Sequence, residues 1–134
     1  MKQFAIILGL IAVFGFTAGA SAQSKVNVRF APGKTIGYYN GTIKGAKYID
    51  YVLRAKAGQT LRVTFPKNTG APVYFNVMRS GSQEAMSDDA RESQSFRGLL
   101  PDDGAYVVRV YMAKADRLNN KTSNFRIGFS IEVE

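Results

Sequence analysis

The stretch Asn124-Phe125-Arg126-Ile127-Gly128-Phe129-Ser130-Ile131-Glu132-Val133 alternates between polar and apolar residues along its whole length. A period of two places the apolar side chains on one face of an extended chain and the polar ones on the other. This stretch therefore predicts a long strand with one buried face, and it sets the fold class.

The same alternation recurs in the rest of the chain. Gly37, Gly41 and Gly98 interrupt two of the patterns, where they predict β-bulges. No convincing amphipathic helix is present, beyond one or two turns within 83–91. About eight short strands with turns between them predict an all-β fold, a single antiparallel β-sandwich of jelly-roll-like form. The strand patterns cover 25–30, 49–55, 60–65, 73–77 and 106–112, more weakly 36–43 and 93–99, and turn residues separate strands at 57–59, 68–72 and 101–104.

The amino terminus has the features of a secretory signal peptide. Met1-Lys2-Gln3 is a short basic start, an apolar run follows to Gly19, and Ala20-Ser21-Ala22 offers small residues for cleavage. We expect cleavage after Ala22, export to the periplasm or the medium, and a β-sandwich domain over 23–134. The apolar run is shorter than the roughly 20 residues of a membrane span, so no stable span is expected after cleavage.

The composition excludes several kinds of chemistry. The 134 residues include no histidine and no cysteine, so Ser-His-Asp and Cys-His catalysis, thiolate metal sites and disulfides are excluded. The remaining acidic clusters are Asp88-Asp89 with Glu92, and Asp102-Asp103 within a turn. Such carboxylates more often bond the backbone of loops and turns than hydrolyse glycosides or bind calcium. We expect no enzyme, no cofactor and no metal, and a small hydrolase is the weakest of the functions considered.

The charge is strongly basic and uneven. Lys and Arg number 18 against 10 Asp and Glu, a formal charge of +8 that becomes +7 without Lys2. Residues 23–79 carry +9, with ten basic residues and one acidic, and residues 80–134 carry −2, with seven basic and nine acidic. We expect this charge to be spread over both sheets rather than gathered on one face. Export argues against nucleic acid as the partner. An anionic envelope polysaccharide or lipid suits the charge better, and a binding module for one of these is the alternative function.

Two long connections are candidate binding loops. They cover 79–92 and 113–122, and long loops on a rigid sheet often carry binding residues. Arg117 stands out in the second loop because its planar guanidinium suits insertion into an acidic cleft.

The order of segments resembles the periplasmic inhibitors of goose-type (g-type) lysozyme and, more broadly, the prepeptidase C-terminal type of β-sandwich. The likeness covers roughly 25–133, and its most specific part is Ala115-Asp116-Arg117 through Asn120-Lys121-Thr122. The other matching segments are Tyr39-Asn40-Gly41-Thr42-Ile43-Lys44-Gly45, Tyr51–Val63 and Leu100–Val110.

The resemblance implies an exported inhibitor that occludes the active-site cleft of a g-type lysozyme with loop residues. Arg117 falls on the family's inhibitory arginine, which would pair with the carboxylate that serves as the enzyme's acid. The family also uses an aromatic residue after Ile-Lys-Gly, where this chain has Ala46, with Tyr48 two residues on. Such lysozymes are frequently basic, so the acidic residues Asp88, Asp89, Glu92 and Asp116 would have to offset the inhibitor's own charge. The expected partner-binding residues are Arg117, Asp116, Lys114, Tyr48 and Asn120.

Overall fold

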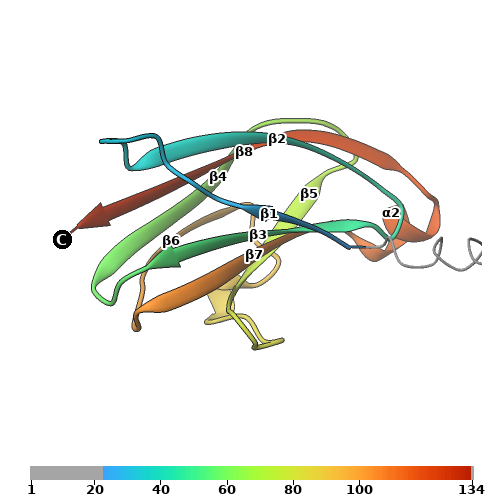
Figure 1. The fold of residues 1–134 in the computed structure, drawn as a ribbon. Helices are drawn as coiled ribbons and strands as arrows, with labels where there is room; N and C mark the ends of the chain where they lie inside the picture. Colours follow the sequence, from blue (N-terminus) through green and yellow to red (C-terminus); the bar gives the residue numbers. More distant parts are fainter. Residues whose placement is uncertain (1–22, 134) are drawn as a thin grey trace, which may run out of the picture.

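The computed structural model describes residues 23–133. The predicted signal peptide and its cleavage after Ala22 lie outside the described residues. Within them, eight strands form two four-stranded sheets that pack face to face (Figure 1). The all-β sandwich predicted from the alternating patterns is confirmed.

The odd-numbered strands form one sheet and the even-numbered strands form the other. The odd sheet has the order β1-β3-β7-β5, and the even sheet has the order β2-β8-β4-β6. Each link between consecutive strands therefore crosses from one layer to the other, as in a jelly roll. The odd strands are β1 (Gln23–Asn27), β3 (Tyr48–Ala55), β5 (Val73–Arg79) and β7 (Gly104–Met112); the even strands are β2 (Ile36–Lys44), β4 (Gln59–Gly70), β6 (Ser95–Leu99) and β8 (Thr122–Val133).

The turns predicted at 57–59 and 101–104 are present, but they join strands of different sheets. Asp103 accepts a hydrogen bond from the backbone N–H of Ala57 at 2.8 Å, and Asp102 forms an ion pair with Arg79 at 2.9 Å. These carboxylates hold the corner of the sandwich together, which is the structural role expected of Asp in a turn.

The core forms where the apolar faces of the two sheets meet. Phe125, Ile127, Phe129 and Ile131 of the alternating carboxyl-terminal stretch are all buried in it. Tyr51 of the odd sheet packs against Phe129 with ring centroids 5.3 Å apart. Burial of large apolar and aromatic side chains is the main stabilising contribution available to a domain without disulfides.

The first strand departs from the expected antiparallel pairing. β1 runs parallel to β3, with Gln23 opposite Tyr48 and Asn27 opposite Val52. A tight turn would impose antiparallel pairing, but the segment 28–35 leads from β1 to the other sheet and so leaves the direction of β1 unconstrained. The strand is also shorter than the predicted 25–30.

The predicted bulges at glycines are wrong. β2 pairs with β8, and β6 with β4, without interruption, and the register shift lies instead between Thr64 and Lys67 of β4, around Pro66. A Cβ atom at Gly41 would lie 2.5 Å from the Phe125 ring, so this glycine makes room for an aromatic side chain. The shift also lets β4 continue to Gly70, through part of the turn predicted at 68–72.

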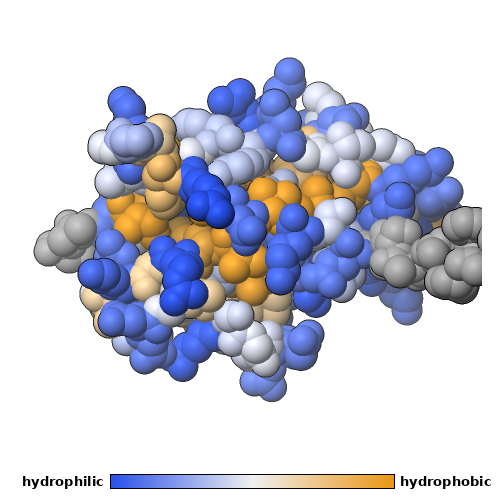
Figure 2. Space-filling model, in the orientation of Figure 1, coloured by the Kyte–Doolittle hydropathy of each residue, from blue (hydrophilic) through white to orange (hydrophobic). Residues whose placement is uncertain are grey.

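Irregular segments close the two open edges of the sandwich. Along the β1–β2 edge, Val28 donates its N–H to Val52 at 2.8 Å, and the Tyr39 hydroxyl bonds the backbone of Arg29. Figure 2 shows an apolar band between hydrophilic side chains on the side where Figure 1 shows β1 and the segment that leads from it to β2. At the other edge, the segment 80–94 runs beside β5, where Ser93 and Phe75 exchange backbone hydrogen bonds, and so covers an exposed strand.

Two short helices lie in the long connections. The 3-10 turn η2 (Asp88–Ala90) falls within the region where one or two helical turns were predicted. The helix α2 (Lys114–Leu118) was not predicted and follows β7 directly. Within 23–133, no helix is long and apolar enough to cross a membrane.

Candidate functional site

The helix α2 and its return loop form a rigid structure at one end of the sandwich. The N–H of Lys121 donates to the carbonyl of Asp116 at 3.0 Å, and that of Asn120 donates to the carbonyl of Arg117 at 3.2 Å. Together with the positive φ of 54° at Asn120, these bonds make a Schellman motif, which ends a helix without leaving its last carbonyls unpaired. The motif therefore fixes the loop that was predicted to bind a partner.

The loop between β2 and β3 packs against this motif. Gly45 has a φ of 59° and donates its N–H to the carbonyl of Lys121 at 2.9 Å. A Cβ atom at Gly45 would collide with the side-chain oxygen of Asn120. Gly45 and Asn120 thus hold the start of β3, where Tyr48 lies, in a fixed position relative to α2.

Three tyrosines lie in one row across the outer face of the odd sheet beside α2. Tyr74 of β5 pairs with Tyr111 of β7. The register of β3 with β7 continues from Asp50 opposite Arg109 and places Tyr48 on the other side of Tyr111. All three side chains are partly exposed. We call Tyr48, Tyr111 and Tyr74 the tyrosine row.

A groove of about 380 Å³ opens between this row and α2. Tyr74, Tyr111, Glu92, Ala113, Lys114 and Arg117 line it. Arg117 is partly buried, and its Nη1 donates to the carbonyl of Met112 at 2.6 Å. This bond anchors one nitrogen of the guanidinium to the end of β7. An arginine has five N–H donors in a planar fork, so the side chain retains donors for a partner's carboxylate.

A salt bridge on the same face supports the tyrosine row. Arg109 donates from Nε and Nη2 to the two oxygens of Asp50 at 2.8 and 3.0 Å, and the side chain of Gln23 donates to Asp50 at 2.6 Å. The side chain of Asp50 is only 6% exposed. The guanidinium of Arg109 lies over the Tyr48 ring, 4.4 Å from its centroid. Asp50 therefore fixes Arg109, and Arg109 in turn holds the ring of Tyr48.

Glu92 and Tyr111 meet at the side of the groove. The hydroxyl of Tyr111 donates to the Asn76 side chain at 2.9 Å, and the same oxygen accepts the N–H of Glu92 at 2.7 Å. Burial raises the pKa of Tyr111, the carboxylate of Glu92 raises it further, and Arg117 lowers it. Glu92 has a φ of 49°, a strained conformation for a residue other than glycine, and its bond to Asn76 helps to hold it there.

The structure brings together three of the five predicted partner-binding residues. Lys114 and Arg117 line the groove, and Tyr48 lies at the far end of the tyrosine row. Asn120 has the structural role described above. Asp116 is partly exposed on α2, and its backbone carbonyl accepts the bond that closes the helix.

The segment 79–92 reaches the groove only at its last residue. Arg79 is bound to Asp102 at the opposite end of the sandwich, whereas Glu92 contacts Asn76 beside Tyr111. Between these points the Ser87 hydroxyl donates to Asp89, and Asp88 pairs with Arg91 of its own segment. Of the acidic residues expected to offset the charge of the inhibitor, this segment therefore supplies Glu92 to the groove.

The sequence reading missed Tyr74 and Tyr111 as site residues. Each occupies a polar position of an alternating strand pattern, and an aromatic side chain there must lie on the outer face of a sheet. The signal available in the sequence was therefore the presence of three tyrosines, Tyr48, Tyr74 and Tyr111, at outward-facing positions of strands. Which of them lie side by side depends on the strand order, which the pattern does not contain.

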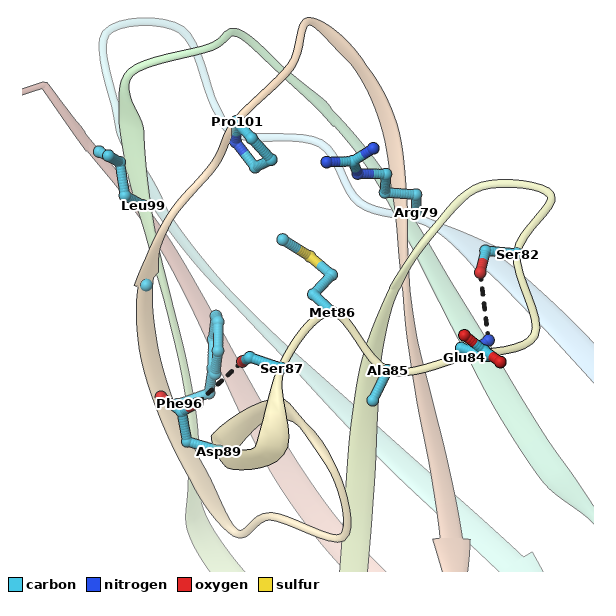
Figure 3. Close-up of a pocket in the computed structure, with 11 residues that line it drawn as sticks. Arg79, Ser82, Glu84, Ala85, Met86, Ser87, Asp89, Phe96, Leu99 and Pro101 are labelled. Carbon is cyan, nitrogen blue, oxygen red and sulfur yellow. Dashed lines mark hydrogen bonds between the residues drawn. The ribbon is translucent and has the colours of Figure 1, made fainter.

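A second hollow, of about 510 Å³, lies between the segment 80–90 and β6 (Figure 3). Met86 extends into it, and Phe96, Leu99 and Pro101 form its apolar wall. Its one basic residue, Arg79, is paired with Asp102. Within 23–133, no group of three or more acidic residues is arranged to hold a metal ion.

Comparison with known proteins gives a consistent result. No family model matches the chain. The inhibitor of g-type lysozyme from Escherichia coli strain K12 is 30% identical over 133 residues, which are 98% of this chain and 96% of that protein. PliG from Aeromonas hydrophila, described as a periplasmic lysozyme inhibitor of g-type lysozyme, superposes with a TM-score of 0.75 at 30% identity, covering 84% of this chain and 100% of that one. A mutant of the Escherichia coli PliG gives a TM-score of 0.67 at 27% identity, with 83% and 100% covered.

Proposed function

Because the chain belongs to the family of g-type lysozyme inhibitors, we propose that it inhibits a g-type lysozyme by occluding the active-site cleft of the enzyme with Arg117 and the tyrosine row. The observation that carries the mechanism is the convergence of Lys114, Arg117 and the tyrosine row at one end of a rigid sandwich. The relatives with solved structures are described as periplasmic, which agrees with the predicted signal peptide and makes the periplasm the proposed location.

The chemistry of Arg117 explains how binding would stop catalysis. A glycosidase needs a protonated carboxylic acid to donate a proton to the leaving oxygen. A guanidinium beside that carboxyl group favours its ionised form and lowers its pKa, so the acid would no longer carry the proton. The paired carboxylate and guanidinium also form charge-assisted hydrogen bonds, which are stronger than neutral ones. Arg117 would therefore both occupy the cleft and disable the acid.

The scaffold around Arg117 lowers the cost of binding. The bond to the Met112 carbonyl and the Schellman motif hold the backbone and one nitrogen of Arg117 before the enzyme arrives. The Tyr48 ring is held by Arg109 and the Tyr111 hydroxyl by Asn76. Side chains that are ordered in advance lose less conformational entropy when an interface forms. Tyrosine and arginine are also the residue types that most often dominate binding energy.

The proposal is tested by titrating the purified protein into a cell-wall clearing assay with a g-type lysozyme. We expect inhibition, and we expect Arg117→Ala to raise the inhibition constant by about 30-fold, which corresponds to about 2 kcal/mol for an interface hot spot. Arg117→Lys keeps the charge but loses the planar fork, so it should restore only part of the inhibition.

Arg54→Ala is the matched control, because Arg54 is an exposed arginine near the opposite end of β3. It removes the same charge and should leave the inhibition constant within about twofold of the parent value. Absence of inhibition at a large molar excess contradicts the function. Equal effects of Arg117→Ala and Arg54→Ala contradict the assigned site.

A further inference from the structure

The outer face of the even sheet gathers much of the basic charge of the protein. Five exposed basic side chains lie on it: Lys44, Arg62, Lys67, Arg97 and Arg126. Among residues 23–133, Glu132 is the one carboxylate on this face, and it lies 3.4 Å from Arg97. The outer face of the odd sheet carries Lys25, Arg54 and Arg109, the last neutralised by Asp50. The surplus thus occurs on both sheets, as expected, but it is concentrated on the even one.

Strand pairing arranges these charges in alternate rows. Arg62 lies beside Arg97 in one row, and Arg126 lies beside Lys67 two rows further along the strands. The row between them is uncharged. Residues on one face of a strand are about 7 Å apart, so the charged rows are separated by about 14 Å. The uncharged rows hold hydroxyl and amide groups. Tyr38, Thr64 and Ser95 lie in one, beside Gly128, and Thr42, Asn124 and Thr69 lie in the next.

Arg126 is held in place at the middle of this face. Its guanidinium lies over the Tyr38 ring, 4.8 Å from the centroid. The ring packs on Gly128, where a Cβ atom would come within 2.7 Å of it. Stacking on a ring leaves the in-plane N–H donors of an arginine directed outward, where they can bind a planar anion. Within 23–133, no carboxylate lies within ion-pair distance of Arg62, Lys67 or Arg126.

Two shallow grooves follow each other along this face. One, of about 270 Å³, runs past Ile36, Tyr38 and Arg62, with hydroxyl groups of Thr64, Ser95 and Ser130 along it. The other, of about 310 Å³, runs past Asn40, Lys67 and Arg126. They form an extended track of cations separated by neutral hydrogen-bonding groups.

From this arrangement we infer that the outer face of the even sheet binds a linear anionic polysaccharide whose sugar rings carry carboxylates. The cations would pair with the carboxylates, and the serine, threonine and asparagine side chains between them would bond the sugar hydroxyls. A nucleic acid requires a series of free aromatic faces on which bases stack, whereas the ring of Tyr38, although 48% exposed, already contacts Arg126 and Gly128. A membrane surface requires apolar side chains that enter the lipid, but Ile36 and Leu99 lie at one end of the face, away from Arg126 and Lys67.

This surface is separate from the one proposed to bind lysozyme. Arg117 and the tyrosine row belong to the odd sheet and to the helix that follows it, whereas the cations of the track lie on the outer face of the opposite layer (Figure 1). The inference does not depend on the proposed inhibition. A variant of the track should keep its inhibitory activity, which distinguishes failure of one proposal from failure of the other.

Calorimetric titration with oligomers of polygalacturonate tests the inference, with neutral dextran, phosphatidylglycerol vesicles and single-stranded oligo(dT) as comparison probes. We expect salt-sensitive binding to polygalacturonate that exceeds binding to the other three. The triple variant Arg62→Ser, Lys67→Ser, Arg126→Ser should bind at least about tenfold more weakly, because three exposed ion pairs are removed. The matched control Lys25→Ser, Arg54→Ser, Lys56→Ser removes equal charge elsewhere and should lose less than about twofold.

The single variant Arg126→Lys keeps the charge but loses the stacked planar fork, so we expect an intermediate loss of about threefold. Lysozyme inhibition and the unfolding temperature of each variant confirm that the fold is intact. Absence of binding to polygalacturonate overturns the inference. So do equal losses in the two triple variants, or tighter binding to dextran, vesicles or oligo(dT).

Discussion

Replacement of Arg109 by methionine tests the most strongly coupled group in the site. Arg109 makes two hydrogen bonds to Asp50, at 2.8 and 3.0 Å, and its guanidinium supports the Tyr48 ring. The pKa of Arg109 is raised, chiefly by the hydrogen bond to Asp50, so the arginine stays protonated. Methionine has a similar length and fills much of the same volume. The variant therefore removes the charge with little loss of packing.

The structure sets the expected loss of stability. The side chain of Asp50 is 6% exposed and that of Arg109 is 27% exposed. Removing one partner of a buried pair leaves an uncompensated charge, and such changes cost about 3 to 5 kcal/mol. Partial exposure of Arg109 and the remaining bond from Gln23 to Asp50 favour the lower value. We expect about 3 kcal/mol, or a fall of about 12 °C in the unfolding temperature of a domain of this size.

The coupling between Arg109 and Asp50 is measured by urea denaturation of four proteins: the parent, Arg109→Met, Asp50→Leu and the double variant. The double variant buries no charge, so it should recover to within about 1 kcal/mol of the parent. Tyr48 would still lack the cation beneath its ring, and a cation–π contact of about 1 kcal/mol implies about fivefold weaker inhibition in the double variant. A loss below about 1 kcal/mol in Arg109→Met would refute the reasoning.

Two further substitutions test the fold around the site. Gly45→Ala should lower the free energy of unfolding by about 2 kcal/mol in urea denaturation, because φ is 59° there and the new methyl group would meet Asn120; a change within about 0.5 kcal/mol would contradict the assigned contact. Tyr51 is buried and its pKa is raised by desolvation, so above pH about 10 only the unfolded state loses this proton, and the free energy of unfolding falls by about 1.4 kcal/mol per pH unit. Tyr51→Phe should make this fall with pH less steep, and equal slopes in the variant and the parent would contradict the shift.

The strands were predictable because a half-buried sheet imposes a period of two on the sequence. The stretch 124–133 becomes β8, and its apolar residues Phe125, Ile127 and Phe129 enter the core as the alternation requires. Even the irregular pattern around 36–43 becomes a full strand. What the alternation cannot contain is the partner of each strand. The turn at Ala57-Gly58-Gln59 has the same residues whether it joins neighbours in one sheet or crosses between two.

The site was predictable only in part, for similar reasons. Arg117 was singled out because of its position in a long loop and the family resemblance. The helix that carries it was missed because five residues are too few to form a helix by their own propensity. Its shape comes from the Schellman bonds at Asn120 and from contact with Gly45, which is distant in sequence. The support for Tyr48 likewise depends on Asp50 and Arg109, 59 residues apart, whose pairing follows from the strand order.

The distribution of charge lessens the repulsion that would be expected between a basic inhibitor and a lysozyme that is itself basic. Repulsion between two proteins depends on the charges near the contact, since an ionic strength of 0.15 M screens exposed charges beyond about 8 Å. Around the groove, Lys114 and Arg117 are accompanied by Glu92 and by Asp116 on the same helix. The larger surplus lies on the outer face of the other sheet, which does not face a partner bound at the tyrosine row. An enzyme approaching α2 therefore meets carboxylates as well as the cations Lys114, Arg117 and Lys121, so the net charge of the whole chain is a poor guide to its partner.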